Sequence, residues 1–215
     1  MQVQQNDPTE LLEVFDTAGN PTGKAKSRAA VHLDGDWHLA FHCWILRHKR
    51  QEVVLQRRSF EKDTFPGYWD AAAAGHWRFG ETPAEAAREI AEELGIEVNF
   101  GELARRGREV SETHFASGLV DREYHQVYVL ESDRPLAQYR PDPAEVIGLA
   151  AFAADDLLAL VEGRTLEVVA RESVAVRPDR AIDPDHVRVR RDDLVPYSAA
   201  RLRRMLGSPD GALLQ

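Results

Sequence analysis

An α/β domain, with helices packed on a β-sheet, is the fold class predicted by the 215-residue sequence. Several apolar runs have the length of a strand and are separated by turn-rich or charged segments. One further segment carries start and stop signals of a helix that agree with each other. Hydrophobic residues make up 43% of the chain and charged residues 29%, as in soluble globular proteins, which excludes a wholly disordered chain.

The chain is expected to open with a β-hairpin at about residues 11–28. A strand-like run at 11–16 is followed by residues 18–23 (AGNPTG), which have the glycine, asparagine and proline chemistry of a turn. Residues 60–68 contain Pro66-Gly67 and predict a loop. The four alanines within residues 69–75 fit either a short strand or a helical fragment. The other strands are expected at residues 38–46, 52–57, 120–131 and 146–152.

A helix is predicted over residues 83–94. Thr82 is a good N-cap, Pro83 suits the first helical position, and Glu85 stands where a capping box needs it. Gly95 provides the residue that commonly ends a helix in the left-handed conformation. A second helix is expected at residues 155–161.

The predicted helix 83–94 has an acidic face. At about 100° per residue, apolar residues gather on one side and four glutamates on the other. Like charges at these spacings repel one another, so the stripe is either a solvated face or a site for a cation such as Mg²⁺ or Mn²⁺. Periodicity alone leaves both interpretations open. The glutamates are Glu85, Glu89, Glu92 and Glu93.

Charge and composition exclude several classes of protein. With 36 acidic residues against 27 lysines and arginines, the net charge is −9, which disfavours binding to a nucleic-acid backbone. The longest apolar runs are strand-sized, well short of the roughly 20 residues that span a bilayer. The single cysteine, Cys43, excludes an internal disulfide. No signal peptide is recognised at the N-terminus, so a cytoplasmic protein without a membrane partner is expected.

The composition changes after residue 176. Residues 177–186 are rich in charge and proline, and the basic run 188–191 is followed at once by Asp192 and Asp193, which cancel much of its charge. A final helix is predicted at residues 198–206. We therefore expect a main domain at residues 1–176 and a C-terminal extension, 177–215, packed on it.

Residues 75–96 resemble the Nudix box, the signature of a family of metal-dependent hydrolases. Gly75 and Glu81 have the separation of the family pattern, and residues 88–96 (REIAEELGI) match its second half throughout. Six residues rather than seven separate Glu81 from Arg88, a departure that we expect to shorten the junction between loop and helix without changing the register of the glutamates. The resemblance implies a Nudix-type α/β/α sandwich with a mixed central sheet, to which the N-terminal hairpin is added.

The resemblance reaches most of residues 11–165 and is strongest to the branch that includes isopentenyl diphosphate isomerase. Segments that carry it include WHLAF at 37–41, VLQRR at 54–58 and PGYWD at 66–70. In those isomerases three histidines and acidic residues bind a metal. The matching positions here are His32, His38 and His76, with Asp121 and Glu123 as the acidic pair.

The isomerases use a cysteine immediately before the Gly-His pair, and here that position is Ala74. They also lack the full double-glutamate box that this chain carries. Both differences favour hydrolysis of a phosphoanhydride, by a Nudix pyrophosphohydrolase acting on a nucleoside diphosphate or a compound linked to one. An isomerase-like enzyme and a non-catalytic binding module of the same fold are the alternatives.

The resemblance also implies residue roles. Glu89, Glu92 and Glu93 would hold Mg²⁺ or Mn²⁺ with the backbone of Gly75, and the histidines and Asp121 would hold a further ion. Glu123, or else Asp121, would take a proton from water. Arg88 would tether a glutamate of the box. Arg57 and Arg58 leave a strand near the site, and one of them is expected to hold a phosphate.

The partner that this resemblance implies is a small phosphorylated molecule. Homodimers are common in the family, so a homodimer is left open. Specificity is expected to come from residues 60–68, from a loop at residues 108–118 and from the C-terminal extension.

Overall fold

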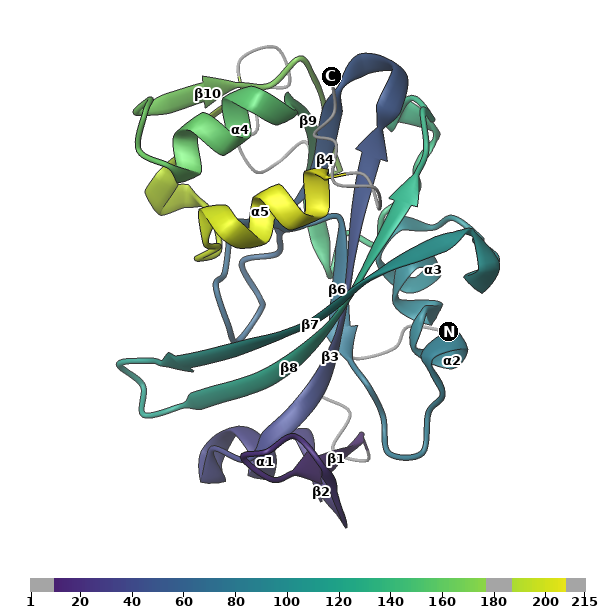
Figure 1. The fold of residues 1–215 in the computed structure, drawn as a ribbon, viewed down its shortest axis with the longest axis vertical. Helices are drawn as coiled ribbons and strands as arrows, with labels where there is room; N and C mark the ends of the chain where they lie inside the picture. Colours follow the sequence, from purple (N-terminus) through teal and green to yellow (C-terminus); the bar gives the residue numbers. More distant parts are fainter. Residues whose placement is uncertain (1–9, 177–186, 208–215) are drawn as a thin grey trace.

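The computed structural model describes residues 10–176 and 187–207 and is built around one large mixed β-sheet (Figure 1). Its strands are β1 (Leu11–Phe15), β2 (Pro21–Ser27), β3 (Trp37–Arg47), β4 (Glu52–Arg58), β5 (Trp69–Ala71), β6 (Ala73–His76), β7 (Leu103–His114), β8 (Val120–Glu131), β9 (Val146–Ala153) and β11 (Glu172–Ala175). A separate pair is formed by β10 (Glu167–Val169) and β12 (Arg188–Arg190).

The helices in the described ranges have between four and eight residues each. None of them is long and apolar enough to cross a bilayer. They are α1 (Arg28–Asp34), α2 (Pro83–Ala86), α3 (Arg88–Leu94), α4 (Ala154–Val161) and α5 (Ala199–Leu206). Short 3₁₀ turns lie at His48–Arg50, Phe100–Glu102, Leu136–Gln138 and Arg191–Asp193.

Strand β3 is the centre of the sheet. It pairs in parallel with β8 along almost its whole length and antiparallel with β4 and β6, which makes the sheet mixed. The path of paired strands runs β11-β9-β4-β3-β1-β2, with β5, β6, β7 and β8 attached beside it. Strands β7 and β8 form a long hairpin that crosses in front of the other strands in Figure 1.

Alternation along β3 divides the interior into two apolar layers. Phe41, Cys43 and Ile45 pack on the side of α3, in the cluster that contains Ile90 and Leu94. Trp44 and Leu46 face the other way, toward apolar side chains of α4 and α5. The α/β/α arrangement predicted from the sequence is therefore confirmed, with α3 on one face and α4 and α5 on the other (Figure 1).

The predicted hairpin and strands are present, and residues 69–75 form strands rather than a helix. Their alanines pair with β4 and β3, so sheet pairing overrides the helical preference of alanine. The prediction of a loop at residues 108–118 was wrong. Most of these residues belong to β7, and only a tight turn at 115–118 connects it to β8. One face of β7 is exposed and the other is half-buried but mostly polar, with Ser111 and Thr113 lining the cavity described below, so the sequence lacks the apolar alternation of a strand.

The predicted helix 83–94 begins and ends where expected but is interrupted at Ala87. The capping box of Thr82 and Glu85 is present, and Gly95 ends α3 in the left-handed conformation. The interruption lies between Glu81 and Arg88, the stretch in which the chain is one residue shorter than the family pattern. Of the four glutamates of the acidic face, Glu85 is exposed to solvent, whereas Glu89 and Glu93 are buried.

Residues 187–207 lie against the rest of the chain. The Val195 N–H donates to the carbonyl of Trp69, and the Tyr197 hydroxyl is hydrogen-bonded to Asp70. Helix α5 buries Leu202 and Met205 in the apolar layer that it shares with α4. The proposed boundary at residue 176 stays a prediction, and 1–9, 177–186 and 208–215 lie outside the described residues.

Cys43 should be unreactive in the folded protein. Its side chain is fully buried, and burial raises the pKa of the thiol to about 12, so almost no thiolate forms near neutral pH. We expect Ellman's reagent to label no thiol in the native protein and one per chain after denaturation in guanidinium. Rapid labelling of the native protein would contradict this burial and would make the thiol available for catalysis.

Candidate active site

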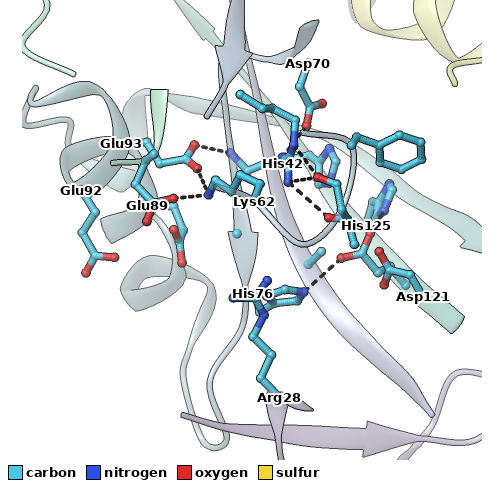
Figure 2. A pocket seen from close by; sticks show the side chains of 18 of the residues that line it. Arg28, His42, Lys62, Asp70, His76, Glu89, Glu92, Glu93, Asp121 and His125 are labelled. Atoms are coloured by element: carbon cyan, nitrogen blue, oxygen red, sulfur yellow. Dashed lines mark hydrogen bonds and ion pairs between the residues drawn. The ribbon is translucent and has the colours of Figure 1, made fainter. Parts of the chain in front are cut away.

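A cavity of about 650 Å³ lies where α3, the central strands and residues 59–65 meet, and charged side chains dominate its lining. In Figure 2 the glutamates of the Nudix-like segment approach it from α3, and Asp121 and His125 approach it from the other side. Every carboxylate and histidine proposed above as a site residue on α3, β6 or β8 lines this cavity. These residues are His76, Glu89, Glu92, Glu93, Asp121 and Glu123.

Glu93 is the most deeply buried glutamate of the site, with 2% of its surface exposed. Its Oε2 accepts hydrogen bonds of 2.9 Å from the side chain of Gln56 and from the backbone N–H of Ala74. The ammonium of Lys62 lies 3.3 Å from its other oxygen and also pairs with Glu145. Glu93 is thus held in one orientation by groups from three separate segments.

Arg88 tethers the other two glutamates. Its guanidinium binds Glu89, lies 2.8 Å from Glu92 and 2.7 Å from Glu81, and donates to the carbonyl of His76 at 3.1 Å. Burial raises the pKa of Glu89 to about 8, although Arg88 beside it acts in the opposite direction. The arginine therefore offsets part of the electrostatic cost of crowding these carboxylates.

Three histidines meet beside these carboxylates. His32 comes from α1, His38 from β3 and His76 from β6, and their ring centroids lie 5.0–5.2 Å apart. Asp121 Oδ1 is 3.7 Å from Nε2 of both His32 and His38, which is too far for a hydrogen bond. Within the described part of the chain, these three atoms are buried without a hydrogen-bond partner. Such an arrangement is suited to a shared cation.

The charges of this cluster depend on burial. Burial, with His38 and Arg28 nearby, lowers the pKa of His32 to about 4, and it also lowers the pKa of His38 and His76. Burial and the charge of Glu123 raise the pKa of Asp121 well above its ordinary value. Burial alone would raise the pKa of Glu123, but its neighbours His125 and His76 hold it well below the usual range. Neutral imidazoles are the form that binds metals.

Strand register explains how these residues meet. The parallel pairing of β3 with β8 sets His38 opposite Glu123, and the antiparallel pairing with β6 sets His76 opposite Ala40. Side chains two residues apart share one face of a strand, so alternate positions of three adjacent strands line the same cavity. Ser27 caps the N-terminus of α1 and Gly35 ends it. This short helix holds His32 beside His38 and His76.

Three residues that line the cavity, His42, Lys62 and His125, were not identified from the sequence, and neither was Arg201, which contacts both histidines from outside the lining. His42 and His125 follow the same alternation as His38 and Glu123, so the period of two could have identified them. Lys62 and Arg201 enter from a loop and from α5, and no local pattern connects them to the site. The helix α1 was also missed, although Ser27 and Gly35 are its start and stop signals.

The two arginines of which one was expected to hold a phosphate lie in different places. Arg58 lines the cavity, where it pairs with Asp70 at 2.9 Å and donates to the carbonyl of Thr64. Arg57 projects from the other face of β4, donates to the carbonyl of Gly67 and lies over the rings of Phe60 and Trp69. Among the described residues that line the cavity, Arg57 is absent.

Residues 36–172 match the family model of the NUDIX domain. The chain belongs to the Nudix family. An uncharacterized Nudix hydrolase from Clostridium acetobutylicum is 32% identical over 190 residues, which cover 87% of this chain and 91% of that protein. An isopentenyl-diphosphate Delta-isomerase from Paenarthrobacter aurescens is 40% identical over 143 residues, or 64% of this chain and 73% of the isomerase.

The fold also matches a solved structure. The crystal structure of a Deinococcus radiodurans protein superposes with a TM-score of 0.52 at 22% identity, covering 72% of this chain and 90% of that one. At this identity the match supports the fold alone. The resemblance to the Nudix family inferred from the sequence is confirmed by the family match and the relatives together.

Replacing Gly75 should disturb Glu89. A Cβ at Gly75 would lie 2.1–2.5 Å from the carboxylate of Glu89, which Arg88 holds in place. We expect Gly75→Ala to stay folded but to weaken Mn²⁺ binding by about 10-fold or more, as the loss of ligand positioning usually does. Calorimetric titration measures this, with Gly101→Ala as the control, because nothing lies within 4 Å of a Cβ there. Equal affinity in both variants would show that the position of Glu89 does not affect the metal.

Proposed function

We propose that the chain is a metal-dependent hydrolase that cleaves the pyrophosphate bond of a nucleoside diphosphate or of a compound linked to one. The observation that carries this proposal is the pairing of opposite charges in one cavity. Carboxylates attract a divalent cation, and cationic side chains attract the oxygens of a phosphate. The cavity contains Glu89, Glu92 and Glu93 together with Arg58, Lys62 and Arg78.

Two donor sets are suited to divalent ions. The glutamates of the box offer only oxygen, which Mg²⁺ and Mn²⁺ prefer, whereas three imidazoles beside two carboxylates favour a transition ion such as Mn²⁺. The unpartnered buried atoms of His32, His38 and Asp121 support the second set. A bound ion would neutralise phosphate charge and lower the pKa of a water molecule.

The protein's own groups have distinct proposed roles. Arg58 and Lys62 would bind phosphate oxygens, and Arg88 would keep Glu89 and Glu92 oriented. Glu123 would accept the proton of the attacking water at its Oε1, since its low pKa keeps it ionised. Asp121 is the weaker candidate for the base, because its raised pKa favours the protonated form.

Isomerisation is the principal alternative, because the isomerase relatives are similarly close in sequence. It requires an acid–base group where the chain has Ala74, whose N–H instead binds Glu93. Cys43 pairs with Ala73 in the sheet but is fully buried on the side of α3. These positions favour hydrolysis. A binding module without catalysis is the third hypothesis. The chain keeps all the glutamates of the box, and this argues against a loss of catalysis.

The proposed partner is a small phosphorylated molecule. A cytoplasmic location, the absence of nucleic-acid binding and a homodimer stay predictions from the sequence.

A Mg²⁺-supplemented panel of nucleotides, nucleotide sugars, dinucleoside polyphosphates, coenzyme A and isopentenyl diphosphate tests the proposed activity by its products. We expect phosphate or a nucleoside monophosphate from at least one compound. Glu89→Gln and Glu93→Gln should each lower that rate by about 10-fold or more, because the amide loses the charge that faces the cation. Glu85→Gln is the matched control, since Glu85 is exposed and glutamine still completes the capping box.

The products separate the alternatives. Dimethylallyl diphosphate would identify an isomerase, and binding without turnover would identify a module without catalysis. Unchanged rates in both box variants would exclude these glutamates from the chemistry even if hydrolysis occurred.

The histidine cluster can be tested by metal binding alone. In a His32→Ala, His38→Ala, His76→Ala variant we expect calorimetry to show one fewer Mn²⁺ site than in the parent protein. His114→Ala is the control, because His114 is an exposed histidine that pairs with Glu112 on β7. The single variant His32→Gln provides the same measurement if the triple variant does not fold. An unchanged number of sites in folded variants would remove the histidines from metal binding.

A further inference from the structure

Arg201 is a buried arginine that enters the site from the C-terminal segment. It belongs to α5, where Ser198 caps the helix and accepts a hydrogen bond from the backbone of Arg201. Only 5% of its surface is exposed, whereas its neighbours Arg203 and Arg204 point outward and pair with glutamates at the surface. A lone buried arginine is costly unless its charge and its donors are used.

Its guanidinium binds two stacked histidines. Nη2 lies 2.8 Å from Nδ1 of His125 and 3.3 Å from Nδ1 of His42, and the two imidazole rings stack at 3.9 Å. The guanidinium also lies over the ring of Tyr197 at 4.6 Å, and its Nε is 4.0 Å from Glu109. The rest of the molecule therefore holds the arginine in a single orientation.

This contact determines which ring nitrogen carries the proton. Arginine has only donors, so Nδ1 of each histidine must accept and cannot carry a proton. A neutral imidazole whose Nδ1 accepts has its proton on Nε2. His125 Nε2 lies 2.7 Å from Oε2 of Glu123 and therefore donates to it.

Glu123 connects this pair to the histidine cluster. Its other oxygen, Oε1, lies 3.4 Å from Nε2 of His76 and 3.8 Å from Nε2 of His38. A continuous line of contacts thus runs from α5 through His125 to the carboxylate that faces the cluster. His42, His125 and Glu123 are close enough to one another for a cation, but the guanidinium already occupies both Nδ1 atoms.

We propose that Arg201 is a positioning residue of this site: it fixes the tautomer and ring orientation of His125, and through His125 it directs Glu123 toward the histidine cluster. This inference deepens the proposed function and rests on it for the role of Glu123 in turnover. It makes the C-terminal segment part of the site. Hydrogen bonds that orient a ligand in this way commonly affect metal affinity by 10–100-fold.

Arg201→Met tests the role, because methionine fills much of the same space without a donor. We expect its Mn²⁺ affinity at the histidine site to fall by about 10-fold or more, and kcat to fall with little change in KM. Nitrogen-15 NMR at one neutral pH should show the proton of His125 moving away from a fixed Nε2 position. Arg201→Lys should restore part of the affinity, since lysine again supplies a donor. Arg203→Met is the matched control on the same helix and should leave all three readouts unchanged.

A second variant separates positioning from packing. His125→Phe keeps an aromatic ring against His42 but cannot donate to Glu123, so it should weaken Mn²⁺ binding as much as Arg201→Met does. The double variant should be no weaker than either single one, because both remove the same link. Additive losses, or an unchanged tautomer and Mn²⁺ affinity in folded Arg201→Met, would overturn the proposal.

The proposed function and this inference can fail separately. Metal affinity and tautomer are measured without substrate, so they judge Arg201 even if the panel shows no hydrolysis. If the parent protein hydrolyses a compound of the panel and Arg201→Met has the same Mn²⁺ affinity and the same His125 tautomer, the proposed function stands and the positioning role is excluded.

Discussion

The parallel pairing of β3 with β8 is the constraint on which the site depends. The register that sets His38 opposite Glu123 also sets Ala40 opposite His125 and His42 opposite Val127. A shift of one residue would turn every one of these side chains to the opposite face, toward the apolar layer beside α3. That layer contains Phe41, Cys43 and Ile45, so the apolar residues of β3 specify the register that brings the polar ones together. The core and the site are thus two consequences of one alternation.

Burial of so many ionisable groups is the electrostatic problem that this arrangement creates. A buried carboxylate is tolerated when it is paired or hydrogen-bonded. Arg88 forms an ion pair with Glu89, and Lys62 forms one with Glu93. The histidines reach the same end differently, since burial lowers their pKa and leaves them neutral. Asp121 has neither solution within the described residues: its Oδ1 has no hydrogen-bond partner, and burial, together with the charge of Glu123, raises its pKa. A divalent cation at this point would give Asp121 Oδ1 a partner and favour its charged form.

Sequence patterns predicted the parts of the molecule that are specified locally. Strand β8 and the ends of the helix 83–94 follow from apolar alternation and from caps, which are short-range signals. Strand β7 could not be recognised, because its half-buried face carries mostly polar residues, two of which line the cavity, and its other face is exposed. The break at Ala87 lies in the stretch where the chain is one residue shorter than the family pattern, and no local propensity indicated it. Lys62 and Arg201 could not be assigned, since each depends on a long-range contact that only the folded chain makes. His42 and His125 could have been predicted, because each lies two or four residues from a predicted site residue on the same face of its strand.

Ala74 is the position that bears most directly on the choice between the proposed hydrolysis and isomerisation. An isomerase needs an ionisable side chain there, and a methyl group leaves the position with only its N–H, which binds Glu93. Ala74 therefore has no side chain that could transfer a proton to carbon, and its backbone N–H instead orients Glu93. The opposite wall is completed from the far end of the chain, where Arg201 orients His125 and Tyr197 binds Asp70, the partner of Arg58. Both walls thus orient carboxylates through neighbouring donors, and the proposed binding of cations and of a phosphorylated substrate depends on this arrangement.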